Sequence, residues 1–152
     1  PLPPQQVLLV HCLDSDATPL HRLSATQIDE RIDRIIKGTL FMIKETISFF
    51  NKTKPGSIQL IIKRGATDIL PPINAAIYGA LTSLFRSVMT QYQNEPIHIN
   101  TFETDQDSDR EFAGFIVKNI SNEKTNNGKW LRYEPGRGFL SGLGIAQKRK
   151  QL

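Results

Sequence analysis

One stretch of the chain, residues 56–103, constrains the fold more than any other. In it a short apolar run at residues 58–63 is followed by a loop, a helical pattern that begins at Pro72, and a second short run at residues 97–102. An apolar run without alternation is typical of a strand that a parallel sheet buries on both faces. The stretch therefore predicts strand, helix and strand. Because ligands of open parallel sheets bind beyond the carboxyl ends of the strands, residues 63–72 are the first place to look for a site.

Further short apolar runs, before and after this stretch, continue the alternation of strands and helices. Residues 7–12 are predicted to form a first buried strand and residues 130–134 a fourth, with a short possible strand at residues 138–140. We predict an α/β fold over residues 1–152: a single truncated Rossmann-like three-layer unit, with a mostly parallel sheet of about four strands and three main helices. If the strands advance in one direction, right-handed crossovers place the helices on one face. The other face is then left to a partner.

The helices are indicated by their caps and by their apolar period. Ser24 with Gln27, and Ser108 with Glu111, have the spacing of capping boxes in front of the first and the last helix. Pro72 suits the first turn of the middle helix. The apolar residues expected on the inner faces of the first two helices are Ile28, Ile32, Ile35, Ile36, Leu40, Ile43, Ile47 and Phe50, then Ile73, Ala76, Ile77, Ala80, Leu81, Leu84, Phe85 and Val88.

Composition narrows the class of protein. A chain of 152 residues that is 39% hydrophobic and 22% charged is expected to fold as one soluble domain. The net charge of +4 gives a weak indication of nucleic acid, because the basic residues are scattered apart from residues 148–150, so no nucleic-acid partner is expected. No apolar run approaches the ~20 residues of a membrane span. The beginning, PLPPQQ, suggests a piece excised from a longer multidomain chain.

The single cysteine, Cys12, excludes an intramolecular disulfide and a cysteine-based zinc cluster, and it fits a cytoplasmic protein. Together with His11 it stands at the end of the first predicted strand, where a nucleophile and its base would be placed. Neighbours on a strand point to opposite faces, however, and no further His or Cys follows at ligand spacing. We therefore interpret both residues as structural, with no metal site.

The residues that bind a nucleotide in such a fold are missing. The segment after the first strand, LDSDATP, has no glycine, and Asp14 and Asp16 would repel a phosphate. A formal dinucleotide fingerprint at Gly138, Gly142 and Gly144 follows a polar run in place of a strand. The domain is therefore expected to bind no cofactor.

A tyrosine with a lysine four residues later, the pair that can support hydride transfer, is missing as well. The residues found four positions after Tyr78, Tyr92 and Tyr133 are Thr82, Pro96 and Arg137. No residue of the domain is predicted to be catalytic.

From Val7 to about Phe139 the chain resembles the second half of a short-chain dehydrogenase/reductase. The segments LLVHC, GSIQLIIK and ALTSLFRSV take the places of the strand before the Asn-Asn-Ala-Gly turn, the strand that ends at the catalytic Ser, and the helix that follows the Tyr and Lys. By this resemblance the family's Ser, Tyr and Lys positions fall on Lys63, Asn74 and Tyr78. All three catalytic identities are lost, which implies degenerate catalytic positions.

A degenerate half of this kind is similar to the structural subdomain of the ketoreductase in modular type I polyketide synthases. The matching segments are VLLVHCLD, IIKRGA, IYGALTSLFRSV, INTFETD and the final WLRYEPGRGFLSGL, which resembles a closing hairpin. The resemblance implies a non-catalytic unit that braces a catalytic NADPH-dependent ketoreductase acting on β-ketoacyl chains of an acyl carrier protein. Its partners would be that subdomain and other domains of the same megasynthase.

Two alternatives remain. The chain is also compatible with the C-terminal fragment of a divergent NAD(P)-dependent oxidoreductase whose cofactor-binding half lies elsewhere. A module that binds nucleic acid or another anion would use Lys63, Arg64 and the basic residues 148–150.

Overall fold

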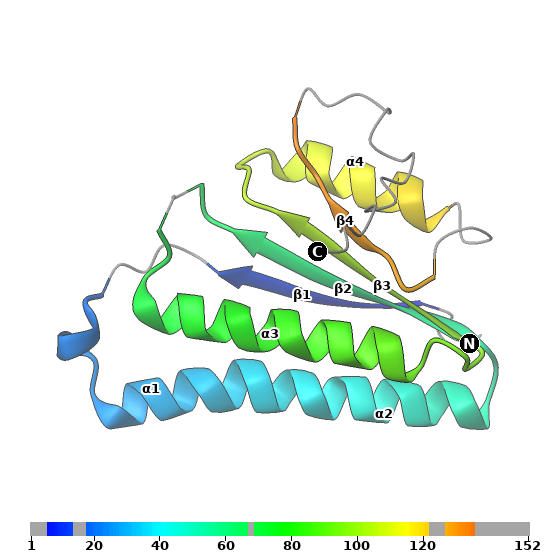
Figure 1. Ribbon diagram of the computed structural model, residues 1–152, viewed down its shortest axis with the longest axis horizontal. Helices are drawn as coiled ribbons and strands as arrows, with labels where there is room; N and C mark the ends of the chain where they lie inside the picture. The colour runs from blue at the N-terminus through cyan, green and yellow to red at the C-terminus, as the bar shows by residue number, and fades with distance from the viewer. Residues whose placement is uncertain (1–5, 14–17, 67–68, 122–126, 136–152) are drawn as a thin grey trace, which may run out of the picture.

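The computed structural model describes residues 6–13, 18–66, 69–121 and 127–135. Within them four parallel strands form one sheet in the order β1-β2-β3-β4, with helices between successive strands (Figure 1). This confirms the predicted α/β, Rossmann-like unit with a parallel sheet. The elements are β1 (Gln6–Leu13), η1 (Leu20–Arg22), α1 (Ala25–Ile32), η2 (Asp33–Lys37), α2 (Gly38–Lys52), β2 (Gly56–Arg64), α3 (Pro72–Gln91), β3 (Ile97–Thr104), α4 (Asp109–Ile120) and β4 (Trp130–Arg132).

Alternate residues of the central strands divide the core into two layers. Ile58, Leu60 and Ile62 of β2 are buried beneath α2 and α3, in the larger of the two apolar clusters. Ile61 points the other way and packs with Phe102 of β3 against α4. The strand β2 is thus buried on both faces, as its unbroken apolar run predicts.

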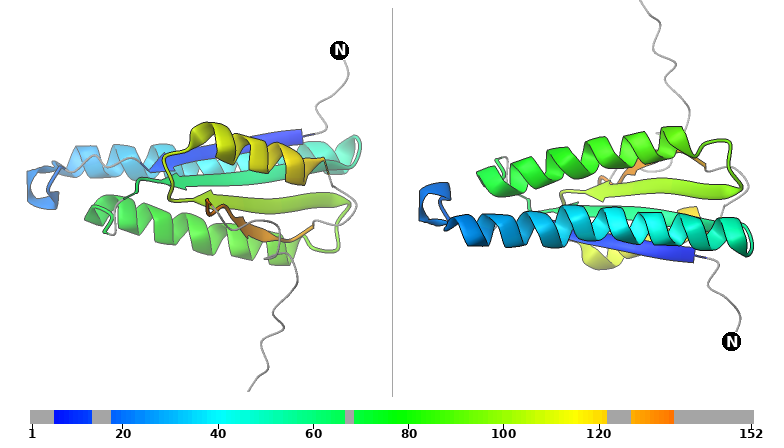
Figure 2. Two further views of the ribbon diagram at one scale, coloured as in Figure 1. Left: turned by 90° about the horizontal axis from the view of Figure 1, so that it is seen from above. Right: turned by 90° about the horizontal axis from the view of Figure 1, so that it is seen from below.

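Helix α4 lies on the face of the sheet opposite to α2 and α3 (Figures 1 and 2). The prediction that all helices share one face was therefore wrong. Because the strand order advances in one direction throughout, the crossover through α4 has the opposite hand to the two before it. The cause is the apolar stripe of α4, centred on Phe112 and Ile116, which covers the residues of β2 and β3 that point away from α3.

Helix α4 does not completely cover its face of the sheet, because the edge formed by β1 remains exposed. Leu8 and Val10 of β1 point to this face and are 48% and 56% exposed. Among the described residues, no strand pairs with the outer edge of β1, whose eight residues all pair with β2 on the inner side. An uncovered patch on this side of the sheet therefore remains, although it is smaller than expected.

The long first helix is interrupted by a wider π-helical turn, η2, between α1 and α2. The buried side of α2 is centred on Ile43, Ile47 and Phe50. Leu40 and Ile32, which the continuous period places in the core, are 45% and 37% exposed. The wider turn breaks the regular helical period that the sequence pattern assumes. Thr39 is buried near Leu40 instead, and its hydroxyl lies 3.0 Å from Nε2 of His11.

The middle helix, α3, begins with Pro72 in its first turn as predicted. Its buried side contains Ile73, Ile77, Leu81, Phe85 and Val88. The expectation that Ala76 and Ala80 also face the core was wrong, because both are exposed. Alanine is small enough for either side of a helix, so the apolar period alone does not separate the two sides.

The two predicted capping boxes have different outcomes. Ser24 and Gln27 form both reciprocal hydrogen bonds, at 3.2 and 2.9 Å. Ser108 is the N-cap residue of α4, but its side chain makes no capping hydrogen bond, so the second box was wrong. Strand β4 is shorter than predicted, and the possible strand at residues 138–140 lies outside the described residues. None of the described helices has the length and apolar character that crossing a membrane requires.

Candidate functional site

The carboxyl ends of β2, β3 and β4 meet at a buried carboxylate, that of Glu103. Its side chain is only 5% exposed. The hydroxyl of Tyr78 donates to Glu103 Oε1 at 2.7 Å, and the indole nitrogen of Trp130 donates to Oε2 at 2.8 Å. Arg64 Nε lies 3.2 Å from Oε1 and forms an ion pair. Both oxygens therefore have partners, as a buried charge requires.

The network continues outward through the guanidinium of Arg64. Its Cζ lies 4.8 Å from the centre of the Tyr78 ring, in a cation-π contact, and its Nη2 lies 3.3 Å from Asp105 Oδ2. The same carboxylate is paired with Arg132 of β4. We refer to these connected residues as the Glu103 cluster: Arg64, Tyr78, Glu103, Asp105, Trp130 and Arg132.

The Glu103 cluster holds the phenol of Tyr78 in its protonated form. Burial raises the pKa of Tyr78, and the hydrogen bond to the Glu103 carboxylate raises it further. A tyrosine that donates a proton in a reduction needs the opposite, a pKa brought down toward neutral pH. The environment of Tyr78 therefore suits a structural hydrogen bond.

Asp105 at the outer end of the cluster has the opposite shift. Burial alone would raise its pKa, but the hydrogen bond from Gln106 and the charges of Arg132 and Arg64 outweigh burial and lower the pKa. Asp105 is thus held as an anion between two guanidinium groups. The carboxyl edge of the sheet is occupied by mutually paired charges.

The three positions suggested by the reductase resemblance do not converge. Lys63 lies on the α4 side of the sheet, where its Nζ is 2.5 Å from Asp109 Oδ1, an ion pair that raises the pKa of Lys63. Asn74 is buried in α3, and Tyr78 lies one turn further along the same helix. The sheet therefore separates Lys63 from Tyr78. The neighbouring Arg64 meets Tyr78 instead, because adjacent strand residues point to opposite faces.

His11 and Cys12 also lie on opposite faces of the sheet. The His11 ring packs near Phe85, with 6.1 Å between ring centres, and burial lowers its pKa. Cys12 is exposed on the other side. Within the residues that the structure describes, no group of three His, Cys, Asp or Glu side chains is placed to hold a metal. The aspartates at 14 and 16, the glycines at 138, 142 and 144, and the basic residues 148–150 all lie outside those residues.

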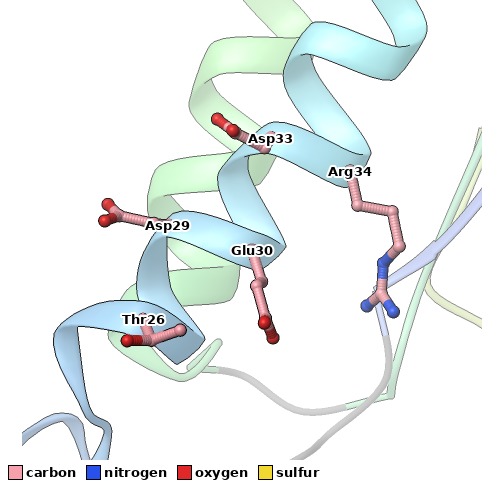
Figure 3. A pocket seen from close by; sticks show the side chains of 5 residues that line it. All are labelled: Thr26, Asp29, Glu30, Asp33 and Arg34. Atoms are coloured by element: carbon pink, nitrogen blue, oxygen red, sulfur yellow. The ribbon is translucent and has the colours of Figure 1, made fainter.

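A surface hollow lies on α1 and η2, and none of its lining residues belongs to the Glu103 cluster. Figure 3 shows the side chains that line it. Asp29 and Asp33 point to one side of the helix, and Glu30 and Arg34 point to the other (Figure 3). Asp33 is paired with Lys37 at 2.6 Å. These side chains do not converge on one point, so the hollow has no arrangement that would hold a ligand. The side chains that line it are Thr26, Asp29, Glu30, Asp33 and Arg34.

Sequence reasoning missed Glu103 and Trp130, and it considered Arg64 only as part of an anion-binding alternative. One signal was available, since Glu103 is a charged residue directly after the strand predicted at residues 97–102. A carboxylate in such a position needs cationic or donor partners. Identifying those partners requires the register between β2, β3 and β4, which the chain pattern does not supply.

No protein-family model matches the sequence, and no curated protein matches it. The fold is similar to that of solved oxidoreductases. A 4-hydroxyisoleucine dehydrogenase complexed with NADH and succinate matches with a TM-score of 0.65 and 17% identity, over 83% of this chain and 65% of that one. An oxidoreductase (short chain dehydrogenase/reductase) from Brucella ovis matches with a TM-score of 0.61 and 10% identity, over 82% and 68%.

These similarities concern the fold alone, the parallel α/β arrangement that this chain shares with both enzymes. The chain spans about two thirds of the length of the enzymes that it matches, 65% and 68%. The identities of 17% and 10% are too low to transfer an activity or a ligand.

Proposed function

We propose that this chain is a non-catalytic unit with a reductase-like fold, which braces a catalytic NADPH-dependent ketoreductase. The observation that carries the proposal is the hydrogen bond from Tyr78 to the buried Glu103 carboxylate, at 2.7 Å. This hydrogen bond directs the hydroxyl of Tyr78, which lies at the carboxyl edge of the sheet, into the protein core. The place where an oxidoreductase of this fold would hold its reacting groups is filled by structural ion pairs.

Two further observations support a bracing role. Lys63, at the position that the resemblance gives to the catalytic serine, lies on the other face of the sheet in an ion pair with Asp109. The exposed Leu8 and Val10 leave part of that face for a neighbouring protein surface. The resemblance to the ketoreductase of type I polyketide synthases suggests the setting, with β-ketoacyl chains on an acyl carrier protein as the partner's substrate.

Calorimetric titration of the chain with NADPH, and separately with NADH, tests the absence of a cofactor site. We expect no saturable heat with either cofactor. A dissociation constant at or below about 10 μM would overturn the proposal, because it would require a phosphate-binding surface that a brace does not need.

A second candidate is the C-terminal part of a divergent NAD(P)-dependent short-chain oxidoreductase, which the similarity of fold to two oxidoreductases favours. The two candidates differ in what Tyr78→Phe does to reductase activity, measured in the protein as its gene encodes it. A brace keeps its partner's turnover per folded molecule. A catalytic role for the hydroxyl would instead lower kcat by at least about 100-fold.

A further inference from the structure

The segment that leads into β4 contains the one Asn-Gly pair of the sequence, Asn127 and Gly128. Asparagine is chemically labile, and it is most labile before glycine, which has no Cβ to keep the asparagine side chain away from the next peptide nitrogen. Both residues are exposed, and a Cβ added at Gly128 would meet nothing within 4 Å. The φ of Gly128 is +68°, so the turn itself requires glycine here. The backbone geometry therefore keeps a labile pair in contact with water.

The reaction open to this pair is deamidation. The peptide nitrogen of Gly128 loses its proton and bonds to Cγ of Asn127, the bond from Cγ to Nδ2 breaks, and the leaving nitrogen takes up protons from water and departs as ammonia. Water then opens the succinimide ring. Cleavage between Cγ and the ring nitrogen gives aspartate, whereas cleavage at the main-chain carbonyl carbon gives isoaspartate. The net reaction consumes water and releases ammonia, so it needs neither an oxidant nor a reductant.

Both reacting groups are held by one residue of β3, Ile99. The N–H of Gly128 donates to the carbonyl oxygen of Ile99 at 3.0 Å, and the N–H of Ile99 donates to Oδ1 of Asn127 at 3.0 Å. We call these two hydrogen bonds the Ile99 clamp. Ring closure requires the Gly128 nitrogen to turn away from Ile99 and toward Cγ of Asn127. The Ile99 clamp must therefore open before the reaction can proceed.

Opening of the Ile99 clamp depends on how firmly β4 is held on the sheet. This strand has only three residues. Two of its side chains anchor it to β3 and to the residue that follows it: Trp130 donates to Oε2 of Glu103 at 2.8 Å, and Arg132 is paired with Asp105. Short edge segments open locally at a lower free energy than the whole domain. Because the clamp lies directly before β4, local opening of β4 also exposes the reacting groups.

We propose that Asn127 is a site of spontaneous deamidation, that the Ile99 clamp gates the reaction, and that the isoaspartate product releases β4 from the sheet. Aspartate keeps an oxygen for the N–H of Ile99 and leaves the backbone unchanged. Isoaspartate adds a carbon atom to the main chain before Gly128, which displaces its N–H from the Ile99 carbonyl and moves Trp130 away from Glu103. The proposal does not depend on the proposed function.

Peptide mapping of the full chain by mass spectrometry, after incubation at mildly alkaline pH, tests the site and its gate. Enzymatic methylation of isoaspartate separates the two products. We expect deamidation at Asn127 in the folded chain to be slower than in the chain unfolded by urea, by at least about tenfold. Equal rates overturn the proposal. So does a folded chain that remains unmodified at Asn127 over an incubation many times longer than conversion in urea takes.

A matched pair of variants tests whether β4 controls the gate. Arg132→Met removes the ion pair between β4 and Asp105, and Lys37→Met removes an ion pair with Asp33 in η2. Both variants lose one positive charge, but only the first loosens β4. We expect folded Arg132→Met to deamidate at Asn127 faster than the unmodified chain, by at least about twofold, and Lys37→Met to keep the unmodified rate. Equal rates in the two variants overturn control by β4.

The fluorescence of Trp130, the single tryptophan of the sequence, tests the release of β4. Asn127→Asp reproduces the product whose backbone is unchanged, so its emission should match that of the unmodified chain. The isoaspartate form, purified by chromatography after incubation, should emit at longer wavelength because Trp130 enters water. An isoaspartate form with the same emission as Asn127→Asp would overturn the release of β4.

Discussion

The hydroxyl of Tyr78 in α3 and the carboxylate of Glu103 in β3 are 2.7 Å apart, and this contact ties the middle helix to the carboxyl edge of the sheet. Because Glu103 is buried, loss of the hydrogen bond from Tyr78 leaves the negative charge of its carboxylate poorly compensated. We expect Tyr78→Phe to lower the free energy of unfolding by about 1.5 kcal/mol. Urea denaturation followed by circular dichroism measures the change. Tyr133→Phe is the control, because its hydroxyl pairs with the exposed Glu111, and an equal loss in both variants would contradict the explanation.

Neighbouring residues at the end of β2 should differ sharply in their contribution to stability. Arg64→Met leaves the buried Glu103 without its cation, and we expect a loss of about 3 kcal/mol. Lys63→Met removes an ion pair to Asp109, a side chain that is 77% exposed, and should cost less than about 1 kcal/mol. Equilibrium denaturation of the two variants in parallel checks the contrast. Similar losses would mean that Glu103 is less dependent on Arg64 than its geometry indicates.

The buried His11 should make the chain less stable in mild acid. Burial lowers its pKa in the folded chain below the ordinary 6.5, so the unfolded chain binds more protons as the pH falls below that value. The free energy of unfolding is thus expected to decrease from pH 6.5 downward, until the folded-state pKa is passed. Measurements at about pH 7.5 and about pH 5.5 test this, with His11→Gln as a variant that cannot gain the charge. If both chains lose the same stability, the effect has another origin.

Two glycines should respond in opposite directions to a methyl group. At Gly56 an added Cβ would lie 2.2 Å from Cε1 of Phe50, a ring buried in the core. Gly56→Ala should therefore destabilise the chain by about 2 kcal/mol through overpacking. Gly79→Ala meets nothing within 4 Å and should stabilise helix α3 by about 0.5 kcal/mol. Thermal and urea denaturation measure both signs, and a stabilised Gly56→Ala variant would show that Phe50 moves aside easily.

The parts of the fold that could be predicted from the sequence are those that a short segment of the chain determines by itself. The apolar run of β2, the cap at Ser24 and the proline at the start of α3 are each local, and the structure contains all three. The face of the sheet on which α4 packs cannot be predicted from the sequence of α4 alone. It depends on which side of β2 and β3 is not covered by the other helices. Ile61 and Phe102 provide that apolar surface only once the strands are in register.

The candidate site shows the same difference between local sequence features and contacts that depend on the whole fold, here for single residues. The motif spacing of known reductases pointed to Lys63 and Tyr78, but these two side chains lie on opposite sides of the sheet. The residue that does meet Tyr78 is the next one along the strand, Arg64. A shift of one position reverses the direction of a strand side chain, so an alignment of motifs without coordinates does not identify the contact.

Within the part of the chain that the structure describes, no strand pairs with the outer edge of β1, and this has a consequence for preparing the protein. All eight residues of this strand, QVLLVHCL, are without a formal positive or negative charge at neutral pH, and the exposed Leu8 and Val10 alternate along one side. Lysine, proline and bulges are the usual means by which an edge strand is kept from recruiting other chains, and β1 has none of these residues. We therefore expect concentrated solutions to form fibrillar precipitates, and we expect Val10→Lys to suppress them.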